Sequence, residues 1–439
     1  MSETLKEQTS NWYVNYGKYI NKNRAFCSVY DGLKLVERRI FQSLVIEAKN
    51  SFTKSARIVG HCIGHFHPHG DASAYGTLVQ LVNNGMVDKQ GNFGTKVGLK
   101  DDGSAGAAAS RYTEVKMNNE VFEEAFELMK YVKEEDSEMC PEVPYLPTRL
   151  PFCLRMKNYS QGIGFGSRAY IPSYSKEDLI RRLDWLLHDK TGDGPIIKPI
   201  TDCTYESKKE DFLQLLKTGK ASLLFKGKLE LDKENKCVYV RSIPVNKKMR
   251  SVVNAFKDEI TVQKSIGYLD ESTVNTKVKF MLTKRGQNLD KLYKKLQQKT
   301  SGSVAFECNM CDKEGNVILV SVDQMLLNTY KMYRSVNETK LVTIISKLET
   351  EIQELINMQK IKEILPELLK KYPDDLDNLV VSIIDKTGLE EKIIRDILDK
   401  YTIPKFLKAK IDIEGKNQEL NSEKNNLQNL DDYVWNRYI

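Results

Sequence analysis

The chain has 439 residues, of which 41% are hydrophobic and 29% are charged, and its net charge at neutral pH is +7. This length allows two to four domains with cores of their own, and the charge permits a polyanionic partner without requiring one. No run of about 18 apolar residues occurs, which excludes proteins with a membrane-spanning helix, and the polar N-terminus has no apolar signal core.

The first elements predicted along the chain are helices. Residues 10–50 have a helical pattern whose apolar positions (33, 36, 40, 41, 44 and 45) share one face, and residues 55–66 form a second helix. Pro68 and Gly70 then break the chain, and Asp71 is expected to cap a third helix over 72–84.

These helices lie in a basic region. Between Lys18 and Arg57 the sequence has nine Lys or Arg against three acidic residues. Two helices joined by a short break in a basic region match a helix-turn-helix outline. The outline alone is weak, because many helix pairs of this kind bind nothing.

The middle of the chain has mixed structure. Residues 86–116 are rich in glycine and predict loops with short strands, and short strands interleaved with helices follow from about 141 to 330. This alternation predicts an α+β region.

The C-terminal part is predicted to be helical. Apolar residues step by four and three from Leu341 to Leu355, and by seven from Ile413 to Val434. Such spacing is typical of a coiled-coil seam. We expect one helix to lead out to a small helical globule and another to return, although an ordinary helical bundle would show the same periodicity.

Cysteine usage suits a reducing compartment. The eight cysteines are scattered, and only Cys308 and Cys311 have the spacing of metal ligands. A structural zinc needs four ligands, and no second pair lies nearby in the sequence. We interpret the two as incidental thiols at the end of a strand, with no metal site on the chain.

The segment "AAASRYTE" could carry chemistry. A phenol is a poor nucleophile at neutral pH unless a neighbouring cation stabilises the phenolate. Arg111 beside Tyr112 supplies a permanently charged fork that suits phosphate oxygens. Upstream, "HFHPHGD" places His65, His67 and His69 two residues apart, a spacing that fits either a metal site or phosphate contacts.

Six ordered stretches carry a family resemblance: "RAFCSVYDGLKLVERRIF", "SARIVGHCIGHFHPHGDASAY", "QGNFG", "AAASRYTEV", "PTRLPFCL" and "GIGFGSRAYIP". In this order the chain resembles the breakage-reunion subunit of type IIA DNA topoisomerases, the A subunit of gyrase and topoisomerase IV. The similarity to the family is strongest over residues 10–175 and weaker over residues 190–330. It is visible again in the helical C-terminal part. In its short form, the chain most resembles the medium subunit of the T-even phage topoisomerase within this family.

The resemblance implies a set of site residues. Tyr112 would be the nucleophile that links to a DNA 5′-phosphate, with Arg111 on the scissile phosphate and Arg24, His67 and His69 assisting cleavage. A second group of residues would contact DNA. Within this group, Asn92 would shape the loop near the tyrosine and Ile163 would insert between base pairs. The expected DNA-binding residues are Lys34, Arg38, Arg39, Lys54, Arg57, Asn92 and Ile163.

The resemblance also implies a domain plan and partners. The fold class would be α+β multidomain, with a winged-helix DNA-gate domain over 1–150, an α+β tower over 151–330, and an antiparallel coiled coil with a dimerisation globule over 331–439. The chain would act as a homodimer on double-stranded DNA. An ATPase/toprim partner subunit would bind Mg²⁺ and use ATP, since the sequence shows neither a toprim pattern nor a phosphate-binding loop.

The activity implied is ATP-dependent passage of one duplex through another. Because the sequence ends after the returning helix, without a DNA-wrapping domain, we expect relaxation or decatenation without negative supercoiling. The location would be the bacterial host cytoplasm. Two alternatives remain open: a helix-turn-helix protein that binds DNA without cutting it, and a metal-dependent hydrolase built on His65, His67 and His69.

Overall fold

The computed structural model describes residues 5–102, 105–284, 286–373, 375–400 and 403–438. The chain divides into two compact units, Met1–Tyr333 and Arg334–Ile439. The second begins close to the boundary expected at 330/331, whereas the division expected at residue 150 falls inside the first unit and stays a prediction. No helix in the described part is long and apolar enough to cross a membrane.

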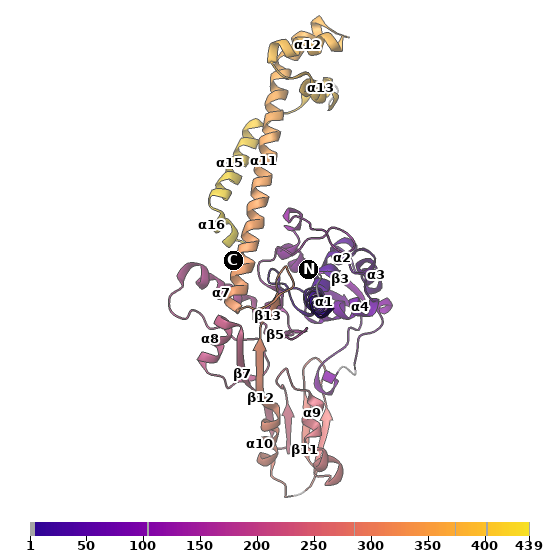
Figure 1. The fold of residues 1–439 in the computed structure, drawn as a ribbon, viewed down its shortest axis with the longest axis vertical. Coiled ribbons are helices and arrows are strands. Elements are labelled where there is room, and N and C mark those ends of the chain that lie inside the picture. The colour runs from indigo at the N-terminus through magenta and orange to yellow at the C-terminus, as the bar shows by residue number, and fades with distance from the viewer. Residues whose placement is uncertain (1–4, 103–104, 285, 374, 401–402, 439) are drawn as a thin grey trace. The chain divides into compact units, whose positions relative to one another are not determined.

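The first unit begins with helices around a small sheet (Figure 1). The helical pattern expected over 10–50 is interrupted at residues 26–34, and Asp71 is the first residue of its helix rather than the cap, because Gly70 occupies the cap position. The helices of this part are α1 (Leu5–Ile20), the π-helical turn η1 (Asn21–Ala25), α2 (Leu35–Glu47), α3 (Ser55–His65) and α4 (Asp71–Asn83).

A three-stranded antiparallel sheet is formed by one strand before the helix pair α3 and α4 and two strands after it. Its order is β1-β3-β2, with Thr53 opposite Val115 and Val87 opposite Met117. The strands are β1 (Thr53–Lys54), β2 (Val87–Gln90) and β3 (Glu114–Met117). The short turns and helices around it are η2 (Gly98–Asp102), η3 (Ser110–Tyr112), α5 (Asn119–Ala125), η4 (Met129–Tyr131) and α6 (Phe152–Arg155).

A five-stranded antiparallel sheet, of order β4-β5-β12-β7-β6, joins segments that are far apart in sequence. Its central strands β7 and β12 alternate apolar residues inward, so that Leu223 pairs with Val304 in the core. The strands are β4 (Ser160–Ile163), β5 (Arg168–Ile171), β6 (Thr204–Tyr205), β7 (Lys220–Lys226) and β12 (Ser301–Glu307). Nearby are α7 (Lys176–Asp184), η5 (Trp185–Asp189), α8 (Lys209–Thr218) and the hairpin β13 (Asn309–Cys311) and β14 (Val317–Leu319).

A second core lies under the four-stranded sheet β10-β11-β9-β8. Val238, Phe256 and Phe280 are buried there, and Leu99 of η2 packs against them. The strands are β8 (Leu229–Asp232), β9 (Cys237–Val240), β10 (Ile266–Asp270) and β11 (Val278–Leu282), with helices α9 (Met249–Asn254), η6 (Asp258–Val262) and α10 (Leu289–Thr300). The expected α+β alternation is therefore present, as antiparallel sheets.

The second unit shows the expected outgoing and returning helices. The long helix α11 (Val322–Lys371) starts in the first unit, and its later part runs alongside α15 (Figure 1). Leu348 and Ile352 of α11 pack against Leu420 of α15. The globule and the returning helices are α12 (Leu376–Thr387), α13 (Glu391–Lys400), α14 (Ile403–Lys408), α15 (Ile413–Gln428) and α16 (Leu430–Trp435). The packing of α11 against α15 agrees with the expected outgoing and returning helices; the coiled coil as a distinct subdomain and its role in dimerisation stay predictions.

Candidate active site

Tyr112 lies on a single 3₁₀ turn, η3, that leads directly into β3. Its backbone N–H donates to the Ala109 carbonyl at 2.8 Å, while its side chain is 65% exposed. The guanidinium of Arg111, also exposed, lies over the Tyr112 ring at 4.6 Å from the centroid. The adjacent residues therefore present a phenol and a cation to solvent together, in contact with each other.

The loop containing Asn92 runs beside this turn, as the resemblance implied. The Asn92 backbone carbonyl accepts a hydrogen bond from Ala108 N–H at 2.9 Å, and its side chain accepts one from Gly94 N–H at 2.9 Å. Gly94 has a φ of +79°, and a Cβ there would overlap the Ala105 carbonyl. The fragments "QGNFG" and "AAASRYTE" are thus held against each other by backbone contacts.

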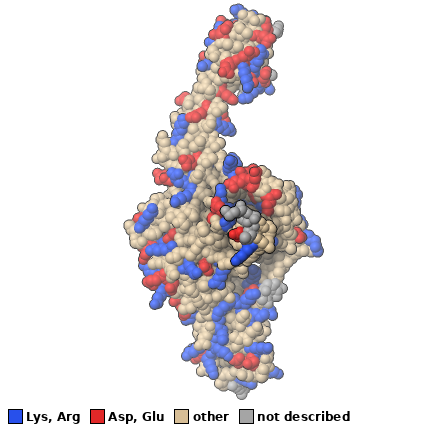
Figure 2. All heavy atoms as spheres, viewed as in Figure 1, with Lys and Arg blue, Asp and Glu red and all other residues tan. Residues whose placement is uncertain are grey.

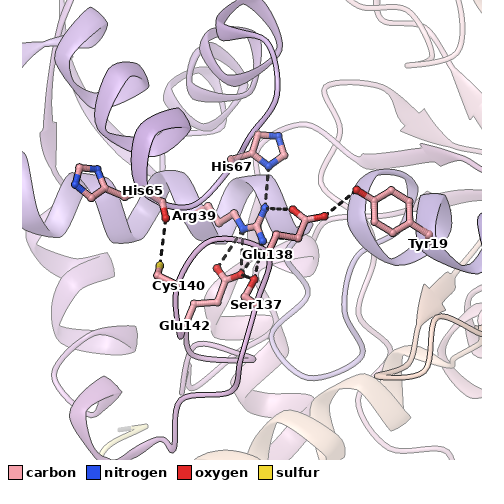
Figure 3. A network of polar contacts seen from close by, with 8 residues as sticks. All are labelled: Tyr19, Arg39, His65, His67, Ser137, Glu138, Cys140 and Glu142. Atoms are coloured by element: carbon pink, nitrogen blue, oxygen red, sulfur yellow. Dashed lines mark hydrogen bonds and ion pairs between the residues drawn. The ribbon is translucent and has the colours of Figure 1, made fainter.

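Arg39 is the buried centre of a polar network near the histidines (Figure 3). Its guanidinium, 1% exposed, donates to Glu142 at 2.7 Å and to Glu138 at 3.3 Å, and it lies 3.1 Å from Nδ1 of His67. Tyr19 donates to the other oxygen of Glu138 at 2.8 Å. A guanidinium has only donors, so Nδ1 of His67 accepts, and the ring proton resides on Nε2.

The same surroundings keep His67 neutral. Burial, followed by the charges of His69, Arg39 and Arg24, lowers the pKa of His67 from 6.5 to about 4, against the opposing effect of Glu138. His69 stacks on the His67 ring at a centroid distance of 4.4 Å. His67 can therefore donate a hydrogen bond through Nε2, but at neutral pH it carries no charge.

Arg38 also lies in a buried ion pair. It donates through Nε and Nη2 to Asp31 at 2.8 and 3.1 Å, and Asp31, fully buried, accepts the N–H groups of Leu33 and Leu146 as well. As placed, neither Arg38 nor Arg39 faces solvent, so contact with a DNA phosphate would require these pairs to open. Their expected role in DNA binding stays a prediction, and their observed role is to hold the segment 135–146 against α2.

The other expected DNA contacts are accessible. Lys54 and Arg57 are 56% and 68% exposed, in ion pairs with Glu114 and Glu47. The Lys34 amine donates to the Gln161 carbonyl at 2.6 Å. Surface pairs of this kind contribute little to stability and exchange readily for other partners.

Arg24 and Ile163, 139 residues apart in sequence, belong to segments in direct contact. Ile163 ends β4 and is 87% exposed, and Arg24 is exposed on η1. A Cβ at the neighbouring Gly162 would overlap the Ala25 carbonyl, so the two segments meet backbone to backbone. The Ile163 side chain is therefore accessible to another molecule.

A second basic region, in addition to the predicted one between Lys18 and Arg57, lies later in the chain. Figure 2 shows Lys and Arg gathered over the part that contains β11 and α10. Between Lys226 and Lys299 the sequence has eighteen Lys or Arg against eight Asp or Glu. Counting charge along the whole sequence would have found this second basic region.

A set of hydroxyls that was not predicted lies behind the Tyr112 turn, on Ser55, Tyr75 and Thr113. These residue types are common, and their meeting depends on the fold. In the described part of the chain no group of three His, Cys, Asp or Glu could hold a metal ion. In the described residues His65, His67 and His69 therefore lack the further ligands that the hydrolase alternative requires.

The family model and the relatives that match this chain all describe the A subunit of DNA gyrase or topoisomerase IV. The family model for the DNA gyrase/topoisomerase IV A subunit matches residues 24–437. The DNA gyrase A subunit of Neisseria gonorrhoeae is 27% identical over 439 residues, covering 89% of this chain and 46% of that protein. The Campylobacter fetus protein of the same name is 35% identical over 250 residues, covering 52% and 28%, and that of Clostridium acetobutylicum is 26% identical over 428 residues, covering 90% and 50%. The chain thus spans about half the length, or less, of these relatives.

Proposed function

The chain belongs to the A-subunit family of DNA gyrase and topoisomerase IV, and from this premise we propose that it is the DNA-cleaving and rejoining component of an ATP-dependent type II DNA topoisomerase. The observation that carries the proposal is the exposed phenol of Tyr112 in contact with the Arg111 guanidinium, on a turn fixed by backbone hydrogen bonds.

The proposed reaction is a transesterification. The Tyr112 oxygen attacks a backbone phosphorus, a Tyr–O–P bond forms, and the bond from phosphorus to the 3′-oxygen of the preceding nucleotide breaks. The phenol gives up its proton and the departing 3′-oxygen takes one up, so the charge is balanced. Arg111 would stabilise the negative charge that develops on the phosphate oxygens. Because one phosphodiester replaces another, the 3′-hydroxyl can reverse the step and rejoin the strand.

Two other expected residues have a place in this proposal. Neutral His67 would donate a hydrogen bond from Nε2 once the site opens toward DNA, rather than supply a charge. Ile163 would insert between base pairs and bend the DNA, a device that unstacks one step to let the duplex wrap more protein surface. The basic surface between Lys226 and Lys299 would hold flanking DNA through its phosphates, which predicts strongly salt-dependent binding.

Mg²⁺ and ATP are assigned to a partner subunit in this proposal. The acidic residue near the nucleophile, Glu114, is paired with Lys54 at 2.7 Å, and the described residues of this chain do not form a cluster suited to a metal. The relatives are named as A subunits of DNA gyrase, which accords with a partner that supplies the other components.

A dimer follows from the chemistry. One tyrosine cuts one strand, so opening a duplex takes two copies. The antiparallel helix pair and the globule of the second unit would join the copies at a gate through which the passed duplex leaves. The enzyme would act on DNA in the cytoplasm; closeness to the phage members stays a prediction.

The test combines the chain with its ATPase partner, Mg²⁺ and supercoiled plasmid, followed by denaturant. Wild type should give plasmid linked covalently to protein, and Tyr112→Phe should give none. The matched control is Tyr131→Phe, which also removes a phenolic hydroxyl; its described contact is the Lys130 amine over the ring at 5.1 Å.

End labelling adds a second criterion. The protein should block the 5′ end and leave a 3′-hydroxyl that a polymerase extends. Adducts that persist in Tyr112→Phe, or protein on the 3′ end, would refute the proposal. DNA binding without any adduct, with all components present, would favour the non-enzymatic helix-turn-helix alternative.

A further inference from the structure

Tyr75 touches both ends of the turn that carries Tyr112. It lies on α4, half-buried, and its phenol donates to the Ala108 carbonyl at 2.6 Å. The same oxygen lies 3.0 Å from the Thr113 hydroxyl. Ala108 and Thr113 flank the 3₁₀ turn Ser110–Tyr112, so one side chain spans the turn from behind.

Thr113 continues this contact to α3. It is fully buried, and its hydroxyl donates to that of Ser55 at 2.8 Å, while the Ser55 backbone N–H donates to the Thr113 carbonyl at 2.9 Å. Ser55 is the first residue of α3 and is itself fully buried. The turn is therefore tied by hydroxyl groups to two helices, at a place where unpaired hydroxyls would be costly.

The side chain of Tyr112 is held much less firmly than its backbone. It is 65% exposed, and its described contact is with Arg111, which is exposed too. The position of the nucleophilic oxygen thus depends on the tilt of the turn beneath it. In catalysis a misplacement of about 1 Å can cost about 100-fold in rate.

We propose that Tyr75 and Thr113 are positioning residues for the nucleophile Tyr112, acting through this hydroxyl brace between α4, the turn and α3. The inference rests on the proposed function, because it assigns the brace to the cleavage step. It differs from a purely structural role in one respect: the brace should govern the rate of covalent linkage more than the stability of the fold or the affinity for DNA.

The test compares Tyr75→Phe, Thr113→Val and Thr113→Ser with wild type, each with Mg²⁺ and the ATPase partner. Tyr75→Phe removes the hydroxyl and keeps the aromatic ring. Thr113→Val removes the hydroxyl and keeps the shape of the side chain, whereas Thr113→Ser keeps the hydroxyl. At saturating DNA, Tyr75→Phe and Thr113→Val should form the denaturant-trapped adduct about 10- to 100-fold more slowly. Thr113→Ser and the control Tyr131→Phe should stay near the wild-type rate. The Kd for DNA of each of the four variants should differ from that of wild type by less than about twofold.

A second readout needs no activity. Amide hydrogen exchange at residues 110–113 of the isolated chain should speed up in Tyr75→Phe and Thr113→Val, while exchange in α3 stays as in wild type. Faster exchange confined to the turn, together with the slower adduct formation, would support the brace.

Two results would overturn the inference. One is wild-type adduct rates in both Tyr75→Phe and Thr113→Val. The other is a slower rate matched by an equal loss of DNA affinity and thermal stability, which would make the hydroxyls merely structural. If wild type itself forms no adduct, the proposed function fails and takes this inference with it, which separates the two failures.

Discussion

Replacing His67 by Asn should remove a large part of the acid sensitivity of the first unit. The folded state holds the pKa of His67 at about 4, against 6.5 for an unperturbed histidine. Folded chains therefore bind fewer protons here than unfolded chains. The free energy of unfolding therefore has its full value above about pH 6.5 and decreases as the pH falls through 6.5 toward 4.

The size of the effect follows from the two pKa values. At about pH 5 the unfolded histidine is already protonated and the folded one is not, so the free energy of unfolding is lower by about 2 kcal/mol than at neutral pH. Asn keeps an acceptor oxygen near the place of Nδ1, which faces Arg39, but it does not titrate.

The assay is amide hydrogen exchange in α2 at about pH 7.5 and about pH 5, converted to opening free energies. Between these conditions wild type should lose about 2 kcal/mol more than His67→Asn. His188→Asn, at an imidazole that is 54% exposed beside Asp184, should follow wild type within about 0.5 kcal/mol. Equal pH dependence in wild type and His67→Asn would refute the reasoning, because His67 would then titrate alike in both states.

Three further substitutions, one of them with a matched control, test other parts of the structure. Asp31→Ala should lower the free energy of unfolding by about 3 to 5 kcal/mol in urea titrations, because it leaves the buried Arg38 guanidinium without its carboxylate; a loss below about 1 kcal/mol would show that the pair is solvated. Leu348→Ala should cost about 2 kcal/mol or more in the second unit, whereas Lys424→Ala, at an exposed ion pair, should cost less than about 1 kcal/mol; equal losses would argue against the packed seam. Ile163→Ala should leave stability within about 0.5 kcal/mol yet reduce DNA bending measured by end-to-end energy transfer, and an unchanged bend would exclude the wedge.

The helices of the second unit were predictable because the spacing of apolar residues that specifies them can be read from neighbouring positions in the sequence. Apolar residues repeat along the sequence at helical spacing, so the faces that pack can be found without the fold, and Leu348, Ile352 and Leu420 meet as expected. The break between α1 and α2 was missed, because the chain from 26 to 34 folds around contacts made elsewhere, including Phe152 N–H to the Asp31 carbonyl at 2.9 Å.

The candidate site was predictable only in part. Arg111 and Tyr112 are consecutive in the sequence, so their proximity was predictable, and the fold exposes both side chains to solvent. The basic residues of α2 were expected to face DNA, but Arg39 pairs with Glu142, 103 positions away. A sequence does not reveal which charge finds a distant partner, and such pairing decides whether an arginine is buried or exposed.

By itself the sequence determined the order of the motifs, the adjacency of Arg111 and Tyr112 and the heptad spacing, because each depends on neighbouring residues or on a repeating period. Only the tertiary structure decided that the pKa of His67 is lowered and that Tyr75 spans the turn that carries Tyr112. Burial and hydrogen-bond partners arise where distant segments meet, and they set both the protonation of a side chain and the precision with which a backbone is held.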